Sequence, residues 1–145
     1  MPIMDKVQRI LEKYNTMTLA TIGKTGACAA AVFYAFSEEE NAMIFLSSPK
    51  SEHILNLDNN DKCAATIQEN GLDWEMIKGI QLKGNVELAS GKYWDLYYKK
   101  YPFVETDEKL RPYLERVKLY MLKIKWIRII DNKTGLGKNK EINYD

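Results

Sequence analysis

The sequence predicts a mainly β fold of the α+β class: one domain, residues 1–145, forming a six-stranded antiparallel barrel with peripheral helices. Three observations support this expectation. Six segments have the apolar alternation or the β-branched composition of strands. Short polar or glycine-containing turns separate most of them, as in antiparallel sheets. No repeat, low-complexity segment or linker divides the chain, and closing a barrel leaves few exposed strand edges.

The first half of the chain predicts a helix followed by three strands. Residues 5–14 have helical apolar spacing, and Asp5 is available as the N-cap. Residues 17–22 and 27–36 flank a glycine-bounded turn, which predicts a hairpin. A polar turn then leads into residues 42–47, a third strand expected to pair antiparallel with the second.

The middle of the chain predicts a short helix and two strands. Serines and a proline precede residues 54–58, and both are helix start signals. Residues 62–68 form the fourth strand and residues 76–88 a long fifth strand with period two. Gly79 and Gly84 within it indicate a bulge, a bend or a close approach by a ligand.

The last part predicts two helices, a strand and a tail. Residues 92–101 form a helix whose aromatic face is expected in the core or at a subunit contact, and Pro102 ends it. Residues 107–114 predict a short helix and residues 117–130 the sixth strand. The tail, residues 131–145, is polar and rich in lysine.

Composition and charge narrow the functional classes. The chain has 46% hydrophobic residues, and 21 Lys and Arg against 20 Asp and Glu leave a net charge of +1. A nucleic-acid partner is therefore not expected, because such partners bind to a broad cationic surface. No apolar stretch approaches the roughly 18 residues of a membrane span, and the first residues lack a signal-peptide pattern. We expect no membrane partner and a cytoplasmic protein.

Several common kinds of site lack the residues that they need. Cys28 and Cys63 lie in apolar segments, which predicts two buried, reduced thiols. With His53 as the one histidine and no CxxC motif, we expect no metal site, and a Ser-His-Asp triad would depend wholly on that residue. The GxGK at residues 135–138 lacks the preceding strand and the spacing of a P-loop.

The main candidate site is the segment 46–53, Leu-Ser-Ser-Pro-Lys-Ser-Glu-His. A strand that runs into a serine-rich helix start brings together free backbone N–H groups, hydroxyls and the positive end of a helix dipole, which suits a phosphate. Lys50 adds a charge, and His53 can donate a ring N–H or carry a charge. The alternative is that the serines cap a surface helix and that His53 is exposed.

The order of these parts resembles the pyridoxamine 5'-phosphate oxidase-like FMN-binding split-barrel superfamily, and within it a small bacterial subgroup. The resemblance covers nearly the whole chain. It is carried by the N-terminal helix and by residues 19–22, 29–34, 45–61, 77–84 and 131–138.

This resemblance implies FMN as the cofactor, held at the interface of a homodimer. The second strand would lie beside the isoalloxazine ring, through Ala29, Ala31, Val32, Phe33 and Tyr34. The end of the third strand and the next helix start would surround the phosphate, through Leu46, Ser47, Ser51, Glu52 and His53, with Lys50 nearby. Gly79 or Gln81 would reach the flavin from the fifth strand. A contribution from the partner chain, near Trp126 or in the tail, stays open.

Two departures from the family pattern keep two functional hypotheses open. Ser51-Glu52-His53 stands where the family usually has Ser-Arg-Lys, and Ala29 and Tyr34 replace basic residues of the oxidases. The first hypothesis is an FMN-dependent oxidoreductase with a small-molecule substrate or electron donor. The second is a non-catalytic module that binds flavin, deazaflavin or haem.

Overall fold

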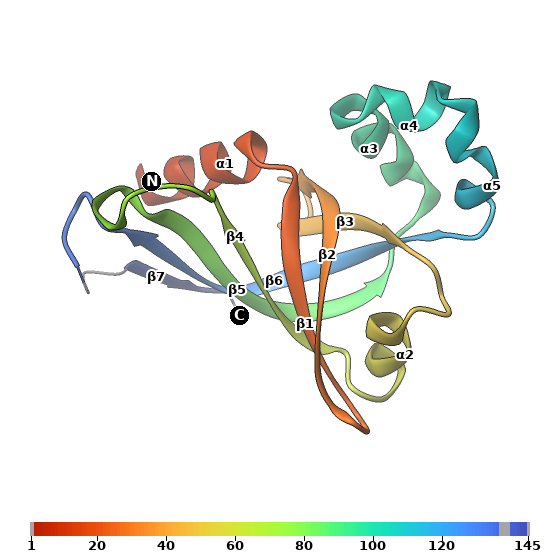
Figure 1. The fold of residues 1–145 in the computed structure, drawn as a ribbon, viewed down its shortest axis with the longest axis horizontal. Coiled ribbons are helices and arrows are strands. Elements are labelled where there is room, and N and C mark those ends of the chain that lie inside the picture. Colours follow the sequence, from red (N-terminus) through yellow and green to blue (C-terminus); the bar gives the residue numbers. More distant parts are fainter. Residues whose placement is uncertain (1, 137–139, 145) are drawn as a thin grey trace.

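The computed structural model describes residues 2–136 and 140–144. Its main feature is one strongly bent antiparallel sheet (Figure 1). The strands are β1 (Thr16–Gly23), β2 (Gly26–Ser37), β3 (Ala42–Ser47), β4 (Lys62–Gln68), β5 (Lys78–Leu88), β6 (Lys118–Asp131) and β7 (Lys140–Asn143). The helices are α1 (Pro2–Lys13), α2 (Glu52–Asn59), α3 (Trp94–Lys100), α4 (Pro102–Thr106) and α5 (Arg111–Leu114).

The sheet closes into the predicted six-stranded barrel. Its strand order is β3-β2-β1-β4-β5-β6-β7, and an additional antiparallel pairing of β3 with β6 joins the two sides. β7 pairs along β6 outside this ring, so it is an extra strand. The fold class is therefore confirmed, with one strand more than the sequence predicted. Among the described residues, no helix has the length and apolarity that a membrane span requires.

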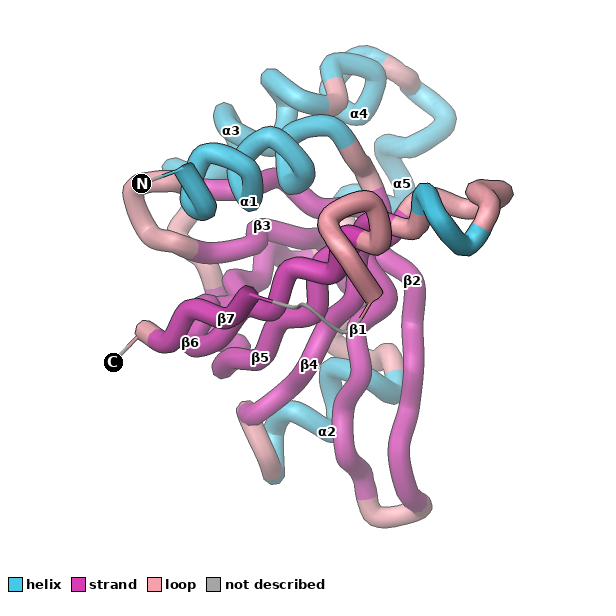
Figure 2. The backbone as a smooth tube through the Cα atoms, turned by 90° about the vertical axis from the view of Figure 1, so that its left-hand side faces the viewer, coloured by secondary structure: helices cyan, strands magenta, loops and turns pink. Residues whose placement is uncertain are grey.

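The helices cover three different parts of the barrel. α1 lies over one opening, and α2 lies beside the far part of the β1–β2 hairpin (Figure 2). α3, α4 and α5 lie between β5 and β6 in the chain and form a separate group near the C-terminal end of β3 and the start of β6 (Figure 1). This arrangement leaves β2 between α2 and the α3–α5 group.

Two apolar clusters hold these parts together. The first fills the barrel, with Leu19, Phe45, Leu82 and Leu122 among its fully buried side chains. The second packs α3 and α4 on the outer sides of β2, β3 and β6; its members include Ala35, Ile44, Leu46, Tyr93, Tyr97, Tyr101, Val104 and Met121. Every residue of β3 is buried because both of its faces are covered. The aromatic face predicted in residues 92–101 thus lies in the core.

Several boundaries differ from the prediction for local reasons. α1 begins at Pro2, so Asp5 lies in its first turn and is not the N-cap. α3 ends at Lys100, just before Pro102 as predicted, but Pro102 also begins a further helix, α4, at a position where its missing N–H costs nothing. Cys63 is buried as expected, but Cys28 is only half-buried, and both are free thiols. In the GxGK motif, Gly137 and Lys138 lie outside the described residues.

The two glycines of β5 approach neighbouring strands. The register of β5 against β6 shifts between Lys83 and Gly84, which confirms a bulge. A Cβ atom on Gly84 would lie 1.8 Å from the carbonyl oxygen of Lys123, and one on Gly79 would lie 2.7 Å from that of Ile67. The atoms that come close to these two glycines thus belong to the protein backbone, whereas the sequence had also left a close approach by a ligand open.

Lys100 connects the α3–α5 group to the C-terminal end of α1. Its Nζ donates hydrogen bonds to the carbonyl oxygens of Tyr14, at 2.6 Å, and of Leu11, at 3.4 Å. The same atom lies 4.2 Å from the centre of the Tyr34 ring. Cations at a helix C-terminus and over an aromatic face are both favourable, but here the ammonium group is partly removed from water.

Replacement of Lys100 by methionine is expected to change how stability depends on pH. Burial lowers the pKa of Lys100 to about 8, and nearby Glu12 opposes this only in part. In the unfolded chain this lysine has an ordinary pKa near 10.4, so above pH 8 the unfolded state binds more protons than the folded state. The parent protein should therefore gain stability relative to Lys100→Met between pH 8 and 9.5. Urea unfolding at several pH values measures this difference in the free energy of unfolding, and Lys99→Met is the control. A difference that stays constant or falls between pH 8 and 9.5 would contradict the prediction.

Candidate functional site

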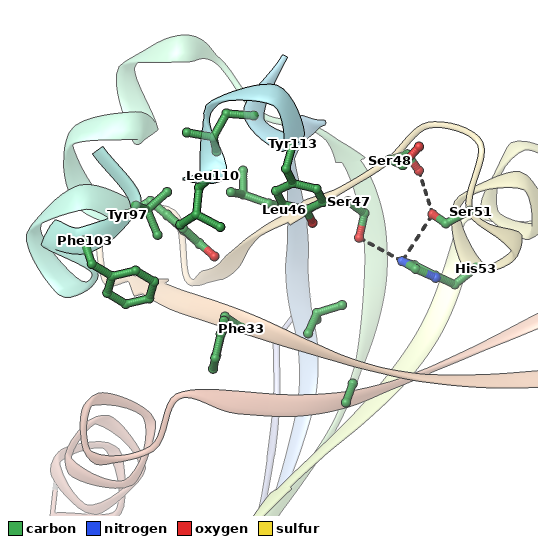
Figure 3. A pocket seen from close by; sticks show the side chains of 14 residues that line it. Phe33, Leu46, Ser47, Ser48, Ser51, His53, Tyr97, Phe103, Leu110 and Tyr113 are labelled. Carbon is green, nitrogen blue, oxygen red and sulfur yellow. Dashed lines mark hydrogen bonds between the residues drawn. The ribbon is translucent and has the colours of Figure 1, made fainter. Parts of the chain in front are cut away.

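A cavity of about 430 Å³ lies between β2, the corner from β3 to α2, and the α3–α5 group (Figure 3). One end is polar and consists of Ser47, Ser48, Ser51 and His53. Ala31, Val32 and Leu46 also line the cavity. The other end is apolar and consists of Phe33, Tyr97, Phe103, Val104, Leu110, Tyr113 and Leu114.

The polar end is built where β3 stops and α2 starts. Ser47, the last residue of β3, is buried, and its hydroxyl forms a 2.8 Å hydrogen bond with Nε2 of His53 (Figure 3). Ser51 precedes α2 in the extended conformation of an N-cap, but its hydroxyl donates to the carbonyl oxygen of Ser48 at 2.6 Å. No side chain therefore caps α2, and its first N–H groups are left for another acceptor.

The surroundings of His53 favour its neutral form near pH 7. Burial lowers the pKa of its imidazole, and the carboxylate of Glu52 opposes this in part. An anion placed beside the ring would raise the same pKa. The imidazole can thus supply a positive charge when an anion binds. Without an anion it stays neutral, so no unpaired charge is buried.

The structure brings together seven of the residues predicted to contact a cofactor. They line the cavity from three elements: Ala31, Val32 and Phe33 from β2, Leu46 and Ser47 from β3, and Ser51 and His53 from the start of α2. Ser48 belongs to the same corner and lies in the segment that the sequence singled out, although it was not chosen as a contact.

The other predicted residues lie around the cavity or far from it. Ala29 is exposed on β2, nearer the hairpin, and Lys50 is exposed in the corner. Glu52 is exposed beside Cys28, where its carboxylate is the largest cause of a raised thiol pKa. The Tyr34 side chain is buried on the opposite face of β2, and its hydroxyl donates to the Leu11 carbonyl oxygen at 2.8 Å.

The predicted contacts on β5 do not reach this cavity within one chain. Gly79 is buried in the sheet opposite Gln68 of β4 and Ile130 of β6. Gln81 pairs with Thr66 and Arg128, and its side-chain oxygen accepts a 3.4 Å hydrogen bond from the Arg128 guanidinium. A contact from either residue to the same ligand would have to come from a second copy of the chain.

Sequence reasoning missed the whole apolar end contributed by the α3–α5 group. A signal was present, because Leu110, Tyr113 and Leu114 have the spacing of one helical face. Tyr97 lay in the aromatic helix, where burial in the core was the expected role. Periodicity identifies such a face without identifying which cavity it borders.

Comparison with known proteins identifies the family. The family model described as pyridoxamine 5'-phosphate oxidase matches residues 3–131. The chain belongs to this family. A UPF0306 protein of Campylobacter jejuni is 27% identical over 137 residues, which cover 94% of this chain and 96% of the relative. A UPF0306 protein of Pasteurella multocida is 23% identical and covers 90% of this chain and 85% of its own length.

Solved structures share the split-barrel fold of the pyridoxamine 5'-phosphate oxidase family. ChuZ of Campylobacter jejuni has a TM-score of 0.77 at 17% identity, covering 98% of this chain and 59% of ChuZ. A haem-binding protein of Mycobacterium smegmatis has a TM-score of 0.69 at 20% identity, and the match covers 93% of this chain and 55% of that protein. A FAD-binding protein of Mesorhizobium loti has a TM-score of 0.63 at 13% identity, and the match covers 86% of this chain and 89% of that protein. These identities support the fold and do not by themselves assign a ligand.

In this member of the pyridoxamine 5'-phosphate oxidase family, the polar end suits a phosphate through hydrogen-bond donors. Among the described residues that line the cavity, none is Lys or Arg. The serine hydroxyls, the uncapped N–H groups of α2 and a proton on His53 are the groups available to an anion. The donor set fits a phosphate group, with the positive charge coming from the helix dipole and from His53.

Proposed function

We propose that this chain binds FMN and works as a flavin-dependent oxidoreductase on a small molecule. The observation that supports this most is the shape and chemistry of the cavity: a phosphate-sized set of donors at the start of α2, continued by the apolar side of β2. FMN, when bound, supplies hydride or electron transfer. The chain's own part is to hold the phosphate, orient the ring and exclude water.

The side chains of β2 fit a flat ring next to the phosphate end. Ala29 and Ala31 are small and exposed on the same face of the strand. Val32 and Leu46 add apolar contacts at the wall of the cavity. A strand that presents small side chains lets a planar group approach its backbone closely, so we place the isoalloxazine ring along Ala29 and Ala31.

We also propose a homodimer with the cofactor at its interface. The face of the β1–β2 hairpin that carries Ala29 is exposed and mostly apolar; it consists of Ala20, Ile22, Ala27, Ala29, Ala31 and Phe33, with Thr16 and Thr18 opposite Phe33 and Ala31. A contiguous exposed apolar face of this kind is typical of an interaction site. Ile22→Glu should convert the dimer to monomers, as measured by light scattering after size-exclusion chromatography, and a parent protein that is monomeric would refute the dimer.

A spectrum of protein purified without added cofactor tests the proposed function. We expect a flavin spectrum, release of FMN identified by mass, and reduction of the bound flavin by NADH or NADPH. A colourless protein that takes up no FMN at micromolar concentration would overturn the proposal.

A second candidate is a module that binds flavin, deazaflavin or haem without turnover. Two observations favour this candidate: one structural neighbour is a haem-binding protein, and the described residues that line the cavity include no Lys or Arg. Bound flavin that dithionite reduces, but that no nicotinamide donor reduces, would support this candidate. Tight haem binding that excludes FMN would identify haem as the ligand.

FMN binding is expected to weaken as the pH rises from 7 to 8. The free imidazole of His53 has a lowered pKa, whereas the phosphate raises it, so binding takes up a proton. Affinity should then fall by up to about tenfold per pH unit between the two pKa values. The phosphate is already mostly a dianion in this range, so the slope belongs to the histidine.

Calorimetry in buffers of different ionisation enthalpy measures this proton uptake directly. His53→Gln can keep a hydrogen bond to Ser47 but cannot become charged, so it should remove both the uptake and the pH dependence. His53→Ala should also weaken FMN. A dissociation constant that is constant over this range in the parent protein would remove His53 as a charged ligand.

A further inference from the structure

A tyrosine hydroxyl at the apolar end of the cavity has no hydrogen-bond partner among the described residues. Tyr97 of α3 is only 3% exposed, and its hydroxyl points into the cavity (Figure 3). Within the described part of the chain, none of the hydrogen bonds uses this hydroxyl, and burial raises its pKa, so it stays a neutral donor. A phenol in this setting is suited to donate a hydrogen bond to a ligand, because its hydroxyl is accessible from the cavity and its donor is not used within the described residues.

The surroundings of that hydroxyl are aromatic and uncharged. Phe33, Phe103 and Tyr113 border the cavity, and each is between 46% and 49% exposed. Val104 and Leu110 complete the apolar wall. Half-exposed rings around a concave site leave apolar area to be covered by a ligand, and rings contact planar groups favourably by stacking or edge to face. An ionised ligand group here would lose water without meeting an opposite charge.

This apolar end lies beyond the flavin position that we propose. β2 runs from the hairpin through Ala29 and Ala31 to Phe33, where the α3–α5 group begins to cover it. The ring proposed along Ala29 and Ala31 therefore extends toward the hairpin, while Tyr97 and Phe103 lie toward the other end of the strand. The two regions are neighbours that meet near Phe33.

We propose that the apolar end is a second subsite, which binds a neutral, planar aromatic compound with a carbonyl-type acceptor that receives a hydrogen bond from Tyr97. This assignment rests on the proposed function, since the compound is the small-molecule partner of the flavin. The α3–α5 group is then the specificity element of the protein. It selects for flat, uncharged molecules and against phosphorylated or carboxylated ones.

Three naphthalene probes and the apoprotein test the subsite independently of activity. 2-Acetylnaphthalene has the acceptor, 2-ethylnaphthalene lacks it, and 2-naphthoate is charged. Fluorescence titration should give at least about tenfold weaker binding for 2-naphthoate than for 2-acetylnaphthalene, because the carboxylate would be desolvated without a partner. Tyr97→Phe should weaken 2-acetylnaphthalene by about five- to tenfold, the value of one hydrogen bond, and leave 2-ethylnaphthalene unchanged.

Matched controls separate this subsite from the flavin site. Tyr98→Phe removes a hydroxyl from the neighbouring tyrosine, which does not line the cavity, and should change nothing. Phe103→Ala should weaken both neutral probes, and FMN affinity should stay within about threefold of the parent in all three variants. Equal affinity for the three probes, or competitive displacement of 2-acetylnaphthalene by FMN, would overturn the subsite. Failure to bind FMN at all would instead overturn the proposed function.

Discussion

Replacing Gly84 with alanine is expected to lower the free energy of unfolding by about 3 kcal/mol. The added Cβ would lie 1.8 Å from the carbonyl oxygen of Lys123 and 3.1 Å from a methyl carbon of Leu122. The carbonyl belongs to the backbone of β6, so it cannot turn aside as a side chain can. Relief requires β5 and β6 to separate at the bulge, which disrupts the longest strand pairing of the barrel.

Gly91 provides the matched control for this substitution. A Cβ at Gly91 meets no atom within 4 Å, so Gly91→Ala should change stability by less than about 0.5 kcal/mol. Urea unfolding followed by far-ultraviolet circular dichroism measures both variants. If Gly84→Ala were as stable as Gly91→Ala, the close approach of β5 to β6 at the bulge would be wrong.

The strands were the most predictable part of the fold. The bounds predicted for residues 42–47 and 62–68 agree with β3 and β4, because dense apolar runs between polar turns leave little choice of register. β7 was missed because its four residues contain one apolar side chain, Ile142. That strand exists through its pairing with β6, a tertiary contact that local pattern does not contain.

The site was predictable as a segment but not as a set of side chains. The corner from Ser47 to His53 could be found because hydroxyls, a strand end and a helix start coincide in the sequence. Alternation along β2 separates two faces, yet it does not say which one borders the cavity, so Tyr34 was grouped with Ala31 although its side chain is in the core. The free hydroxyl of Tyr97 depends on the packing of three helices on the barrel, which no short-range signal describes.

Ser51→Asp is expected to reduce FMN affinity by about 100-fold, because charge-assisted hydrogen bonds to the phosphate are lost and a like charge is added beside it. Aspartate is as good an N-cap as serine, so α2 should remain intact and the melting temperature should not fall. The carboxylate would take the N–H groups of the first turn that Ser51 leaves uncapped. Fluorescence quenching of FMN measures the dissociation constant directly.

Riboflavin and the neutral N-cap substitution Ser51→Asn separate a charge effect from a packing effect. Riboflavin lacks the phosphate, so its affinity should be the same in Ser51→Asp and in the parent, and Ser51→Asn should weaken FMN by no more than about tenfold. If FMN and riboflavin were weakened equally, aspartate would be disturbing the cavity and not repelling a phosphate. The corner between β3 and α2 would then be a helix start without an anion, and a ligand without a phosphate, such as haem, would become the better assignment for the apolar wall of β2.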